Sequence, residues 1–386
     1  MLEVPVAIYC SSASWGGLEM NTCRLAAWLM QRGGNVVLFA MPNSPLVKMA
    51  GSQRIPVITV NRNKRYFDLL NAWEVSRMLR QRGIRHLVIT DNRDLDFGGW
   101  VKALFRDRFF LVYQQHMRLG ITKKDPLHTL RFRRLDAWIT LLPYMEKEIR
   151  QKTLFPSTRV HLIPLGLEME SLLARKLPKT EARQHLELPH SGILMGILGR
   201  LDPQKGQHLV LEALSQLRDQ GTDLSLLIMG ESILNEGIDY RDHLESVVRE
   251  YNLNDRVYFR GYREDIAQFF SAIDLFVLGS YEESYGMVTI EAMAHGVPVI
   301  GSDSGGTPGI LQNGSFGWLY IPKDPQDLAK KITEVITNPA SAEVKALRAK
   351  EYARETFSHL TECRKIELLI NQLHKKIPHG IAMRDS

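Results

Sequence analysis

Short apolar runs alternate with helical patterns along this chain, and the whole pattern occurs twice. Continuous apolar strands joined by helices are typical of a parallel sheet that is covered on both faces. The chain is therefore predicted to be an α/β protein with two Rossmann-like domains that face each other across a cleft. The strands of the first series are expected at residues 6–9, 36–39, 57–60, 87–90, 110–113, 137–140 and 160–163. Those of the second series are expected at residues 196–199, 224–229, 257–259, 275–278 and 297–300.

A chain of 386 residues is also too long for one comfortable core, so two domains are the natural expectation. The N-terminal domain is predicted at residues 1–170 and the second domain at 191–360. The stretch between them, 171–190, contains Pro178 and Pro189 and is interpreted as a linker. No strand follows the last helical stretch, so the segment 361–386 is expected to pack on the second domain or to cross back to the first.

Charge is unevenly divided between the two halves. Residues 1–190 carry 29 Lys and Arg against 16 Asp and Glu, whereas the remaining residues carry 20 against 27. A basic half is expected to meet an anionic partner, such as a membrane surface, an anionic glycan or a nucleic acid. The three cysteines form no C-x-x-C pair, which argues against a zinc site or a disulfide framework and suits a reducing compartment. The N-terminus lacks signal-peptide features, and no apolar run approaches the length of a membrane span.

Two glutamates, Glu283 and Glu291, stand eight positions apart, with a turn at Gly286 and a predicted helix start between them. Eight residues span a little over two helical turns, so one carboxylate can lie on the loop and the other on the helix. Free N–H groups at a helix N-terminus favour phosphate. Carboxylates that bind sugar and ribose hydroxyls on either side of a diphosphate would make a nucleotide-sugar site. As an ordinary alternative, glutamate is common at helix N-termini because of the helix dipole.

Arg200 and Lys205 lie in the segment Gly199–Gly206, at a predicted strand-to-helix junction. An arginine forks around phosphate oxygens and a lysine adds a point charge, so both can bind one diphosphate across the turn. The alternative is a solvated loop with two surface cations. Next to the glutamate pair, the diphosphate interpretation is favoured.

Two weaker candidates lie in the first half. Gly16 and Gly17 follow the first strand, where paired glycines let backbone amides approach a phosphate, although taken alone a tight turn that needs positive φ explains them better. His116 follows a strand and can enter the cleft to hydrogen-bond a substrate hydroxyl, although a lone histidine is more often structural. The acidic pair Asp94 and Asp96 has a spacing that can hold a divalent metal, but we interpret it as a surface or acceptor-side loop.

Taken together, these segments resemble glycosyltransferase family 4, the retaining enzymes with the GT-B fold. The E-x7-E motif matches at Glu283 and Glu291, and the G-G-x-E loop matches at Gly16, Gly17 and Glu19. Further matches are Gly199-Arg200 with Lys205-Gly206, Pro164–Glu168 and the loop Gly301–Gly306. His116 matches the family's active-site histidine, although Met117 stands where an aspartate usually follows. The likeness extends over nearly the whole chain and is more specific in the second domain.

The resemblance implies a retaining enzyme, expected to be a hexosyltransferase, that moves a sugar from a UDP- or GDP-linked donor to a glycan or lipid-linked acceptor. Catalytic roles are implied for His116, Arg200, Lys205 and Glu283. Donor binding is implied for Gly16, Gly17, Gly199, Gly230, Arg263, Gly286, Met287, Val288 and Glu291. A same-face displacement, in which the departing phosphate takes the acceptor proton, needs leaving-group electrostatics more than a strong base. Such a mechanism requires no metal, and none is expected. No cofactor is expected either, because the nucleotide sugar is a substrate.

Basic residues of the first half suggest where an anionic membrane surface would be met. They are Arg62, Lys64, Arg65, Lys123, Lys124 and, on a helix predicted at 127–135, Arg131, Arg133 and Arg134 with Leu130, Phe132 and Leu135 between them. Such a stretch can lie on a bilayer, or it can be a solvated helix with one packed face. We expect a cytoplasmic enzyme, peripheral on the inner face of the membrane, that builds lipopolysaccharide or another envelope polysaccharide.

Two alternatives remain open from the residues alone. A nucleotide-sugar epimerase would use the same fold without an acceptor. A nucleic-acid-binding protein would use the basic half, but no aromatic-rich RNA motif or helix-turn-helix pattern supports it, and no nucleic acid is expected as a partner.

Overall fold

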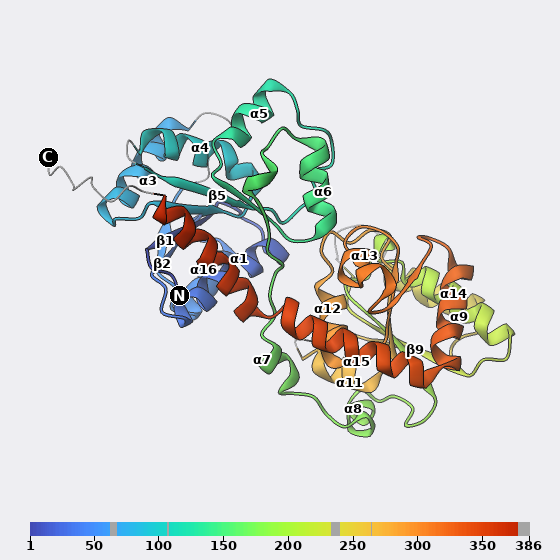
Figure 1. The fold of residues 1–386 in the computed structure, drawn as a ribbon. Helices are drawn as coiled ribbons and strands as arrows, with labels where there is room; N and C mark the ends of the chain where they lie inside the picture. Colours follow the sequence, from blue (N-terminus) through green and yellow to red (C-terminus); the bar gives the residue numbers. More distant parts are fainter. Residues whose placement is uncertain (62–67, 106–107, 233–239, 264, 377–386) are drawn as a thin grey trace, which may run out of the picture. The chain divides into compact units, whose positions relative to one another are not determined.

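The computed structural model describes residues 1–61, 68–105, 108–232, 240–263 and 265–376. The chain divides into two compact units (Figure 1): the first is Met1–Gly166 with His359–Ser386, and the second is Leu167–Ser358. Each unit contains a parallel sheet with helices on both faces. The expected α/β class with two Rossmann-like domains is confirmed.

The first sheet has the strand order β3-β2-β1-β4-β5-β6-β7, with every neighbouring pair parallel. In β1, Val6 is paired with Val36 of β2 on one side and with His86 of β4 on the other. The strands are β1 (Val6–Cys10), β2 (Val36–Ala40), β3 (Val57–Thr59), β4 (His86–Ile89), β5 (Phe110–Gln114), β6 (Ala137–Thr140) and β7 (Val160–Leu162).

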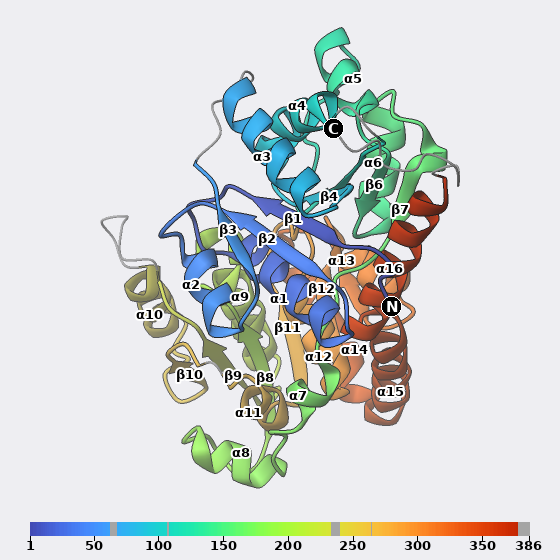
Figure 2. The same ribbon diagram turned by 90° about the vertical axis from the view of Figure 1, so that its left-hand side faces the viewer.

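Both faces of this sheet are buried, which is why its strands are apolar without alternation. Side chains of β1 point in turn to opposite faces, with Ile8 in one core and Tyr9 in the other. Three helices supply the core on the Ile8 face: α1 (Gly17–Gln31), α2 (Pro45–Ser52) and α16 (His359–Lys375). Four helices supply the core on the Tyr9 face (Figure 2): α3 (Leu69–Gln81), α4 (Leu95–Leu104), α5 (Pro126–Arg133) and α6 (Pro143–Lys152).

The second sheet has the order β10-β9-β8-β11-β12-β13, again all parallel. Its strands are β8 (Ile193–Leu198), β9 (Leu224–Met229), β10 (Val257–Arg260), β11 (Leu275–Leu278), β12 (Val299–Ser302) and β13 (Trp318–Tyr320). Its main helices are α9 (Gln207–Asp219), α10 (Tyr240–Glu250), α11 (Ala267–Ala272), α12 (Met287–His295), α14 (Pro325–Thr337) and α15 (Pro339–Thr356). Strand β13 was not predicted, although it lies in the short apolar run at 318–321.

The boundaries between the units differ in detail from the sequence-based expectation. Residues 171–190, interpreted as a linker, lie within the second unit, where they form most of α7 (Met169–Leu173) and all of α8 (Lys179–His185). Helix α8 is held there by Arg183, which is buried and pairs with Asp274 at 2.7 Å. The final helical stretch is two helices, one in each unit, because Ser358 leaves the helix to form a parallel bridge with Leu167.

Among the described residues, no helix combines the length and the apolar character that a bilayer crossing requires.

Helix α16 brings a buried carboxyl group into the first unit. Glu362 is 2% exposed and accepts hydrogen bonds from the Gly166 amide at 2.6 Å and from Gln114 Nε2 at 3.2 Å. Burial raises the pKa of Glu362 to about 7, although the two hydrogen bonds act in the opposite direction. The protonated form is therefore favoured in the folded protein.

The substitution Glu362→Gln is expected to remove a pH dependence of stability. Because the folded pKa of about 7 lies above the ordinary value of 4.5, ionisation of Glu362 costs stability as pH rises between these values, and the loss is complete above the folded pKa. The gain in unfolding free energy of the variant over wild type should grow from pH 4.5 to about pH 8 by on the order of 3 kcal/mol. Urea unfolding at both pH values measures this, with the exposed Glu74→Gln as the control. A gain that is equal at both pH values would contradict the assignment.

Candidate functional site

The candidate site of the second unit lies at the carboxyl ends of the strands, where the central strands β8 and β11 are neighbours. This end of the sheet is called its carboxyl edge. The strand order reverses between these two strands, and open parallel sheets bind ligands beyond the carboxyl ends of their strands at such a point. The predicted residues of this half follow strand ends at this edge or open α12. They are Gly199, Arg200, Lys205, Gly230, Arg263, Glu283, Gly286, Met287 and Val288, with Glu291 one turn further along α12.

Glycines let the loops at this edge approach one another closely. Gly206 has φ +66°, and a Cβ there would overlap the carbonyl oxygen of Gly279, in the loop after β11. A Cβ on Gly279 would in turn lie 2.7 Å from the Gly206 oxygen. Gly230, with φ +151°, likewise leaves no room for a Cβ beside the carbonyl of Gly199. The glycines are therefore needed where the loops after β8, β9 and β11 meet.

The close approach of the β8 and β11 loops brings Lys205 and Glu283 together. Lys205 Nζ lies 2.5 Å from Glu283 Oε1, and Ser280 Oγ donates to the same oxygen at 2.7 Å. The carboxyl group is 14% exposed and the lysine side chain 32%. Two residues that the sequence predicted as separate ligand contacts are thus joined in one partly buried ion pair.

Arg200 lies on the same loop with its side chain half exposed. Its Nη2 pairs with Asp202 at 2.8 Å, and its carbonyl oxygen accepts a hydrogen bond from Gln207 Nε2 at 2.9 Å. The backbone is thereby anchored to α9, while the guanidinium keeps donors for another anion. Asp202 was not singled out from the sequence.

Helix α12 begins at this edge. Gly286 is its N-cap with φ +97°, and the amides of Met287 and Val288 belong to the first turn, where N–H groups have no acceptor within the helix. The loop after β12 holds the preceding segment, since the Gly306 amide donates to the Glu283 carbonyl at 2.7 Å. The resulting arrangement, a helix N-terminus just after the Lys205–Glu283 pair, is suited to an anion.

Two further groups border this edge. Arg263 is exposed after β10, with its Nη2 3.4 Å from Gln268 Oε1. A hydrogen-bonded chain that the sequence gave no signal for joins Tyr281 to His208 at 2.8 Å and His208 to Tyr240 at 2.6 Å. Burial, and then the nearby His243, lower the pKa of His208. The chain connects the β11 loop with the starts of α9 and α10.

In the first unit, Gly16 and Gly17 lie at the start of α1. Gly16 is the N-cap in an extended conformation, with φ −162°, and Gly17, the first residue of α1, does not have a positive φ. The alternative of a turn that needs positive φ is therefore wrong for both. Glu19 in the first turn is buried and accepts a hydrogen bond from Ser12 Oγ.

His116 follows β5 and is half-buried. Burial lowers its pKa to about 4, although Asp91 acts in the opposite direction, so the ring is neutral at pH 7. Within the described chain, its Nε2 is buried without a hydrogen-bond partner. A neutral imidazole can exchange a hydrogen bond with a hydroxyl but supplies no charge.

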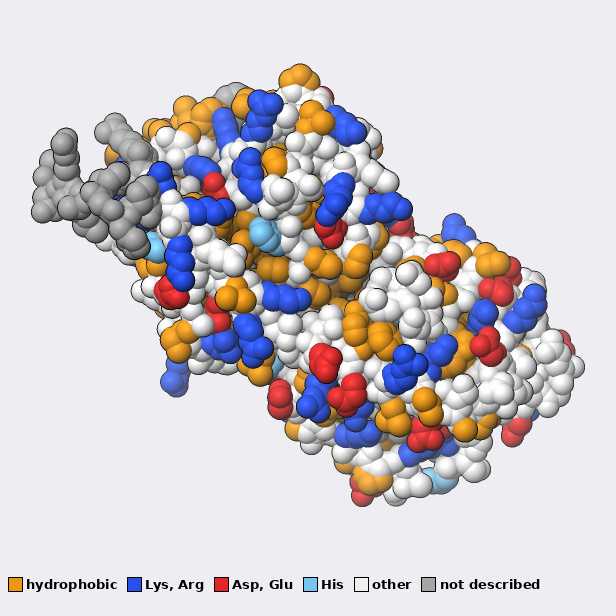
Figure 3. Space-filling model, in the orientation of Figure 1, with side chains coloured by type: hydrophobic (Ala, Val, Ile, Leu, Met, Phe, Trp, Pro, Cys, Tyr) orange, Lys and Arg blue, Asp and Glu red, His pale blue; other side chains and the backbone are white. Residues whose placement is uncertain are grey.

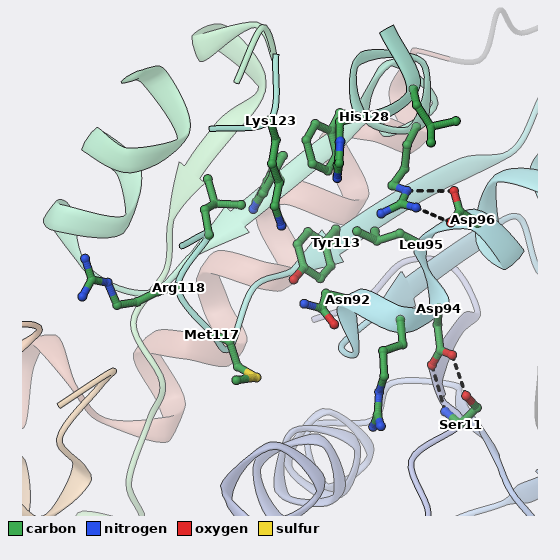
Figure 4. Close-up of a pocket in the computed structure, with 16 residues that line it drawn as sticks. Ser11, Asn92, Asp94, Leu95, Asp96, Tyr113, Met117, Arg118, Lys123 and His128 are labelled. Carbon is green, nitrogen blue, oxygen red and sulfur yellow. Dashed lines mark hydrogen bonds and ion pairs between the residues drawn. The ribbon is translucent and has the colours of Figure 1, made fainter. Parts of the chain in front are cut away.

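A cavity of about 590 Å³ opens at the carboxyl ends of β4 and β5 in the first unit. Figure 4 shows Lys123 and His128 at one end, Asp94 and Ser11 at the other, and Tyr113 with Asn92 between them. The cavity is lined entirely by residues of the first unit.

Protein donors occupy both aspartates of the acidic pair. Asp94 accepts from the Ser11 amide at 2.9 Å and from Ser11 Oγ at 2.5 Å, while Asp96 forms a two-bond pair with Arg131 at 2.8 and 2.5 Å. In the part of the chain that the structure describes, no group of three or more His, Cys, Asp or Glu residues could hold a metal ion.

The basic helix is less exposed than predicted. Phe132 and Leu135 are buried in the core, Arg131 pairs with Asp96, and Arg134 lies over the Trp100 ring with its guanidinium carbon 4.6 Å from the ring centre. The surface over α4, α5 and α6 still carries Lys and Arg side chains among apolar ones (Figure 3). Arg62, Lys64 and Arg65 lie outside the described residues.

Two protein families match this chain. The model described as glycosyl transferases group 1 matches residues 178–356, and the model described as glycosyltransferase family 4 matches residues 15–171. Together the two matches extend through most of both units.

The curated relatives named below match only about half of this chain. The D-inositol 3-phosphate glycosyltransferase of Stackebrandtia nassauensis is 30% identical over 53% of this chain and 47% of its own length. The lipopolysaccharide core biosynthesis mannosyltransferase LpcC of Rhizobium leguminosarum is 29% identical over 47% of this chain and 51% of its own length. The chain spans about half the length of these curated relatives. A crystal structure of Anabaena HepE in complex with UDP is 23% identical, with a TM-score of 0.81 over 96% of this chain and 100% of that one, which supports the fold.

The glycine contact between the β8 and β11 loops can be tested by a matched pair of substitutions. Gly206→Ala and Gly221→Ala both place an alanine at positive φ, +66° and +81°, but only the first meets the Gly279 backbone. We expect Gly206→Ala to cost about 1–3 kcal/mol more unfolding free energy than Gly221→Ala, because overpacking adds to the conformational strain. Urea unfolding measures both. Equal losses would show that the loops do not depend on this contact.

Proposed function

The chain belongs to the group 1 glycosyl transferases, and from that membership we propose that it transfers a sugar from a nucleotide-sugar donor to a glycan or lipid-linked acceptor. The observation that carries the proposal is the Lys205–Glu283 pair beside the N-terminus of α12, at the point where the strand order reverses. Cations and helix amides suit a diphosphate, and a carboxylate suits hydroxyl groups.

In this proposal the donor lies along the carboxyl edge of the second sheet. Arg200 and Lys205 bind the diphosphate together with the amides of Met287 and Val288. Glu283 binds hydroxyls of the transferred sugar, and Glu291 binds the ribose. Gly199, Gly230 and Arg263 border the base. HepE was crystallised with UDP, which makes UDP-sugars the first donors to test.

The proposed chemistry retains the anomeric configuration. The bond between the sugar and the diphosphate breaks as the acceptor hydroxyl attacks from the same face, and the departing phosphate takes the hydroxyl proton. Negative charge therefore builds on the diphosphate, where Arg200 and the α12 amides stabilise it. Lys205 forms an ion pair with Glu283, and it therefore also holds that carboxylate in place for the sugar. Neutral His116 contributes a hydrogen bond to the sugar rather than a charge. No metal takes part.

For the pathway, we propose envelope lipopolysaccharide or polysaccharide synthesis. LpcC acts in lipopolysaccharide core biosynthesis, and its similarity to this chain supports that choice. We propose that the first unit lies against an anionic membrane surface, where a lipid-linked acceptor would be found. The apolar side chains of Leu70 on α3 and Leu130 on α5 are 80% and 55% exposed, and Arg133 beside Leu130 is exposed too.

Vesicle sedimentation tests the membrane proposal. The full chain should pellet with phosphatidylglycerol vesicles at low salt and be released as salt rises, because screening weakens the attraction. Leu70→Glu should weaken binding by about tenfold, since a leucine that enters the interface contributes about 1.5–3 kcal/mol. Leu347→Glu, at an exposed leucine of the second unit, is the control and should leave binding unchanged. A chain that stays in the supernatant at low salt would refute the proposal.

Arg200→Ala and Lys205→Ala test the donor site. Each should lower kcat by about 10²–10³ because each removes a cation from the developing charge. The control is Arg256→Ala, which removes a cation paired with Asp223 at the opposite edge of the same sheet. A thermal-shift panel of UDP-, GDP- and ADP-sugars selects the donor for the assay.

Three outcomes decide between this function and its rivals. Wild-type rates in Arg200→Ala and Lys205→Ala would refute the assigned roles. Conversion of the sugar nucleotide without an acceptor would indicate an epimerase. A salt-dependent gel shift without any sugar-nucleotide binding would indicate a nucleic-acid-binding protein.

A further inference from the structure

The cavity of the first unit contains a lysine whose charge is not balanced within the described chain. Lys123 lines the cavity on the segment before α5, and its own amide donates to the Lys152 carbonyl at 2.7 Å, which fixes its backbone. No carboxylate among the described residues lies within ion-pairing distance of its ammonium group. Burial, and then the charge of Arg131, lower the pKa of Lys123. A half-buried cation beside another cation is costly unless an anion joins them.

Two more nitrogen-bearing side chains flank Lys123. Arg131 is 17% exposed and uses Nε and Nη2 for its pair with Asp96, so that Nη1 is not engaged in that pair. His128 is held by Asp125, whose carboxylate lies 2.6 Å from Nδ1, and its ring stands next to Lys123 in Figure 4. Asp125 thereby fixes the ring orientation.

The other end of the cavity has different chemistry. Asp94 is 1% exposed, and its carboxylate accepts both of the Ser11 hydrogen bonds. Asn92 and Tyr113 lie between the two ends of the cavity in Figure 4. Burial raises the pKa of Tyr113, so its hydroxyl stays protonated and can exchange hydrogen bonds with another hydroxyl. Amide and hydroxyl groups of this kind suit a polyol rather than an anion.

We propose that the acceptor of this enzyme carries a phosphate monoester, which is bound by Lys123, His128 and Arg131 while the acceptor hydroxyls face Asn92 and Tyr113. This inference rests on the proposed function. The phosphate is a spectator in the reaction: a new glycosidic bond forms to an acceptor hydroxyl oxygen, the donor's sugar–phosphate bond breaks, and the hydroxyl proton leaves with the nucleoside diphosphate. Its role is to hold the acceptor by an end that does not react. A cavity of about 590 Å³ is large enough for a phosphorylated sugar or for the headgroup of a phosphorylated lipid.

Calorimetry on the full chain tests the phosphate subsite directly. Glucose 6-phosphate and inorganic phosphate should bind, whereas glucose at the same concentration should not. Lys123→Met, which keeps the length of the side chain, should weaken phosphate binding at least tenfold, and Lys123→Arg should retain it. The neighbouring Lys124 is exposed and does not line the cavity, so Lys124→Met is the matched control and should bind like wild type.

The donor site is itself suited to phosphate, so each measurement is repeated with Arg200→Ala and with UDP. The inference is overturned if phosphate affinity is unchanged in Lys123→Met or is lost in Arg200→Ala instead. UDP binding should be the same in Lys123→Met as in wild type. If UDP binds but Lys123→Met has no effect on phosphate, the inference fails and the proposed function stands. If no nucleotide or nucleotide sugar binds, the proposed function fails and the inference with it.

Transfer assays distinguish the two sources of the phosphate. One arm offers soluble hexose and polyol phosphates, and the other offers vesicles that contain a phosphorylated lipid. Product in either arm that is reduced at least tenfold by Lys123→Met supports the inference and identifies the source. Transfer only to uncharged acceptors, or transfer that is equal in wild type and Lys123→Met, overturns it.

Discussion

The close contact between the loops after β8 and β11 is the constraint on which the candidate donor site depends. Gly206 and Gly279 touch through their backbones, and this contact places Lys205 Nζ within 2.5 Å of Glu283. The same β11 loop is held from the other side by the Gly306 amide. A larger residue at 206 would separate the loops and leave Glu283, which is 14% exposed, without the cation that neutralises it. The backbone contact thus determines the electrostatics of the site.

Most of the fold could be predicted because the strands are buried on both faces and are therefore visible as short apolar runs. All seven strands of the first sheet lie where those runs occur. What could not be predicted depends on contacts between distant residues. The break between α15 and α16 has no local signal, because residues 357–358 contain neither proline nor glycine. The chain leaves the helix there where Ser358 forms a bridge with Leu167. Strand β13, by contrast, lies in the apolar run at 318–321 and could have been expected from it.

The residues at the edge of the second sheet could be found for a similar reason. Each lies directly after an apolar run or at a glycine turn, and in a parallel sheet all such positions share one edge. Their partners could not be found, because pairing depends on loop conformation. Lys205 and Glu283 are 78 positions apart, and nothing local to either one indicates that they form a pair. The chain from Tyr281 through His208 to Tyr240 has no sequence pattern at all.

The excess of positive charge in the first half is a poor guide to where an anion binds. Arg131 pairs with Asp96, Arg118 with Glu148 and Arg93 with Asp91, so much of that charge is compensated inside the unit. Arg134 lies over the ring of Trp100, where its packing matters as much as its charge. Counting cations therefore overstates the attraction of this surface for an anionic partner. A half-buried cation without a carboxylate within the described chain is a sharper sign, because its desolvation has to be offset by a ligand. In this cavity that residue is Lys123, and a net charge summed over a whole domain would not have distinguished it from its neighbours.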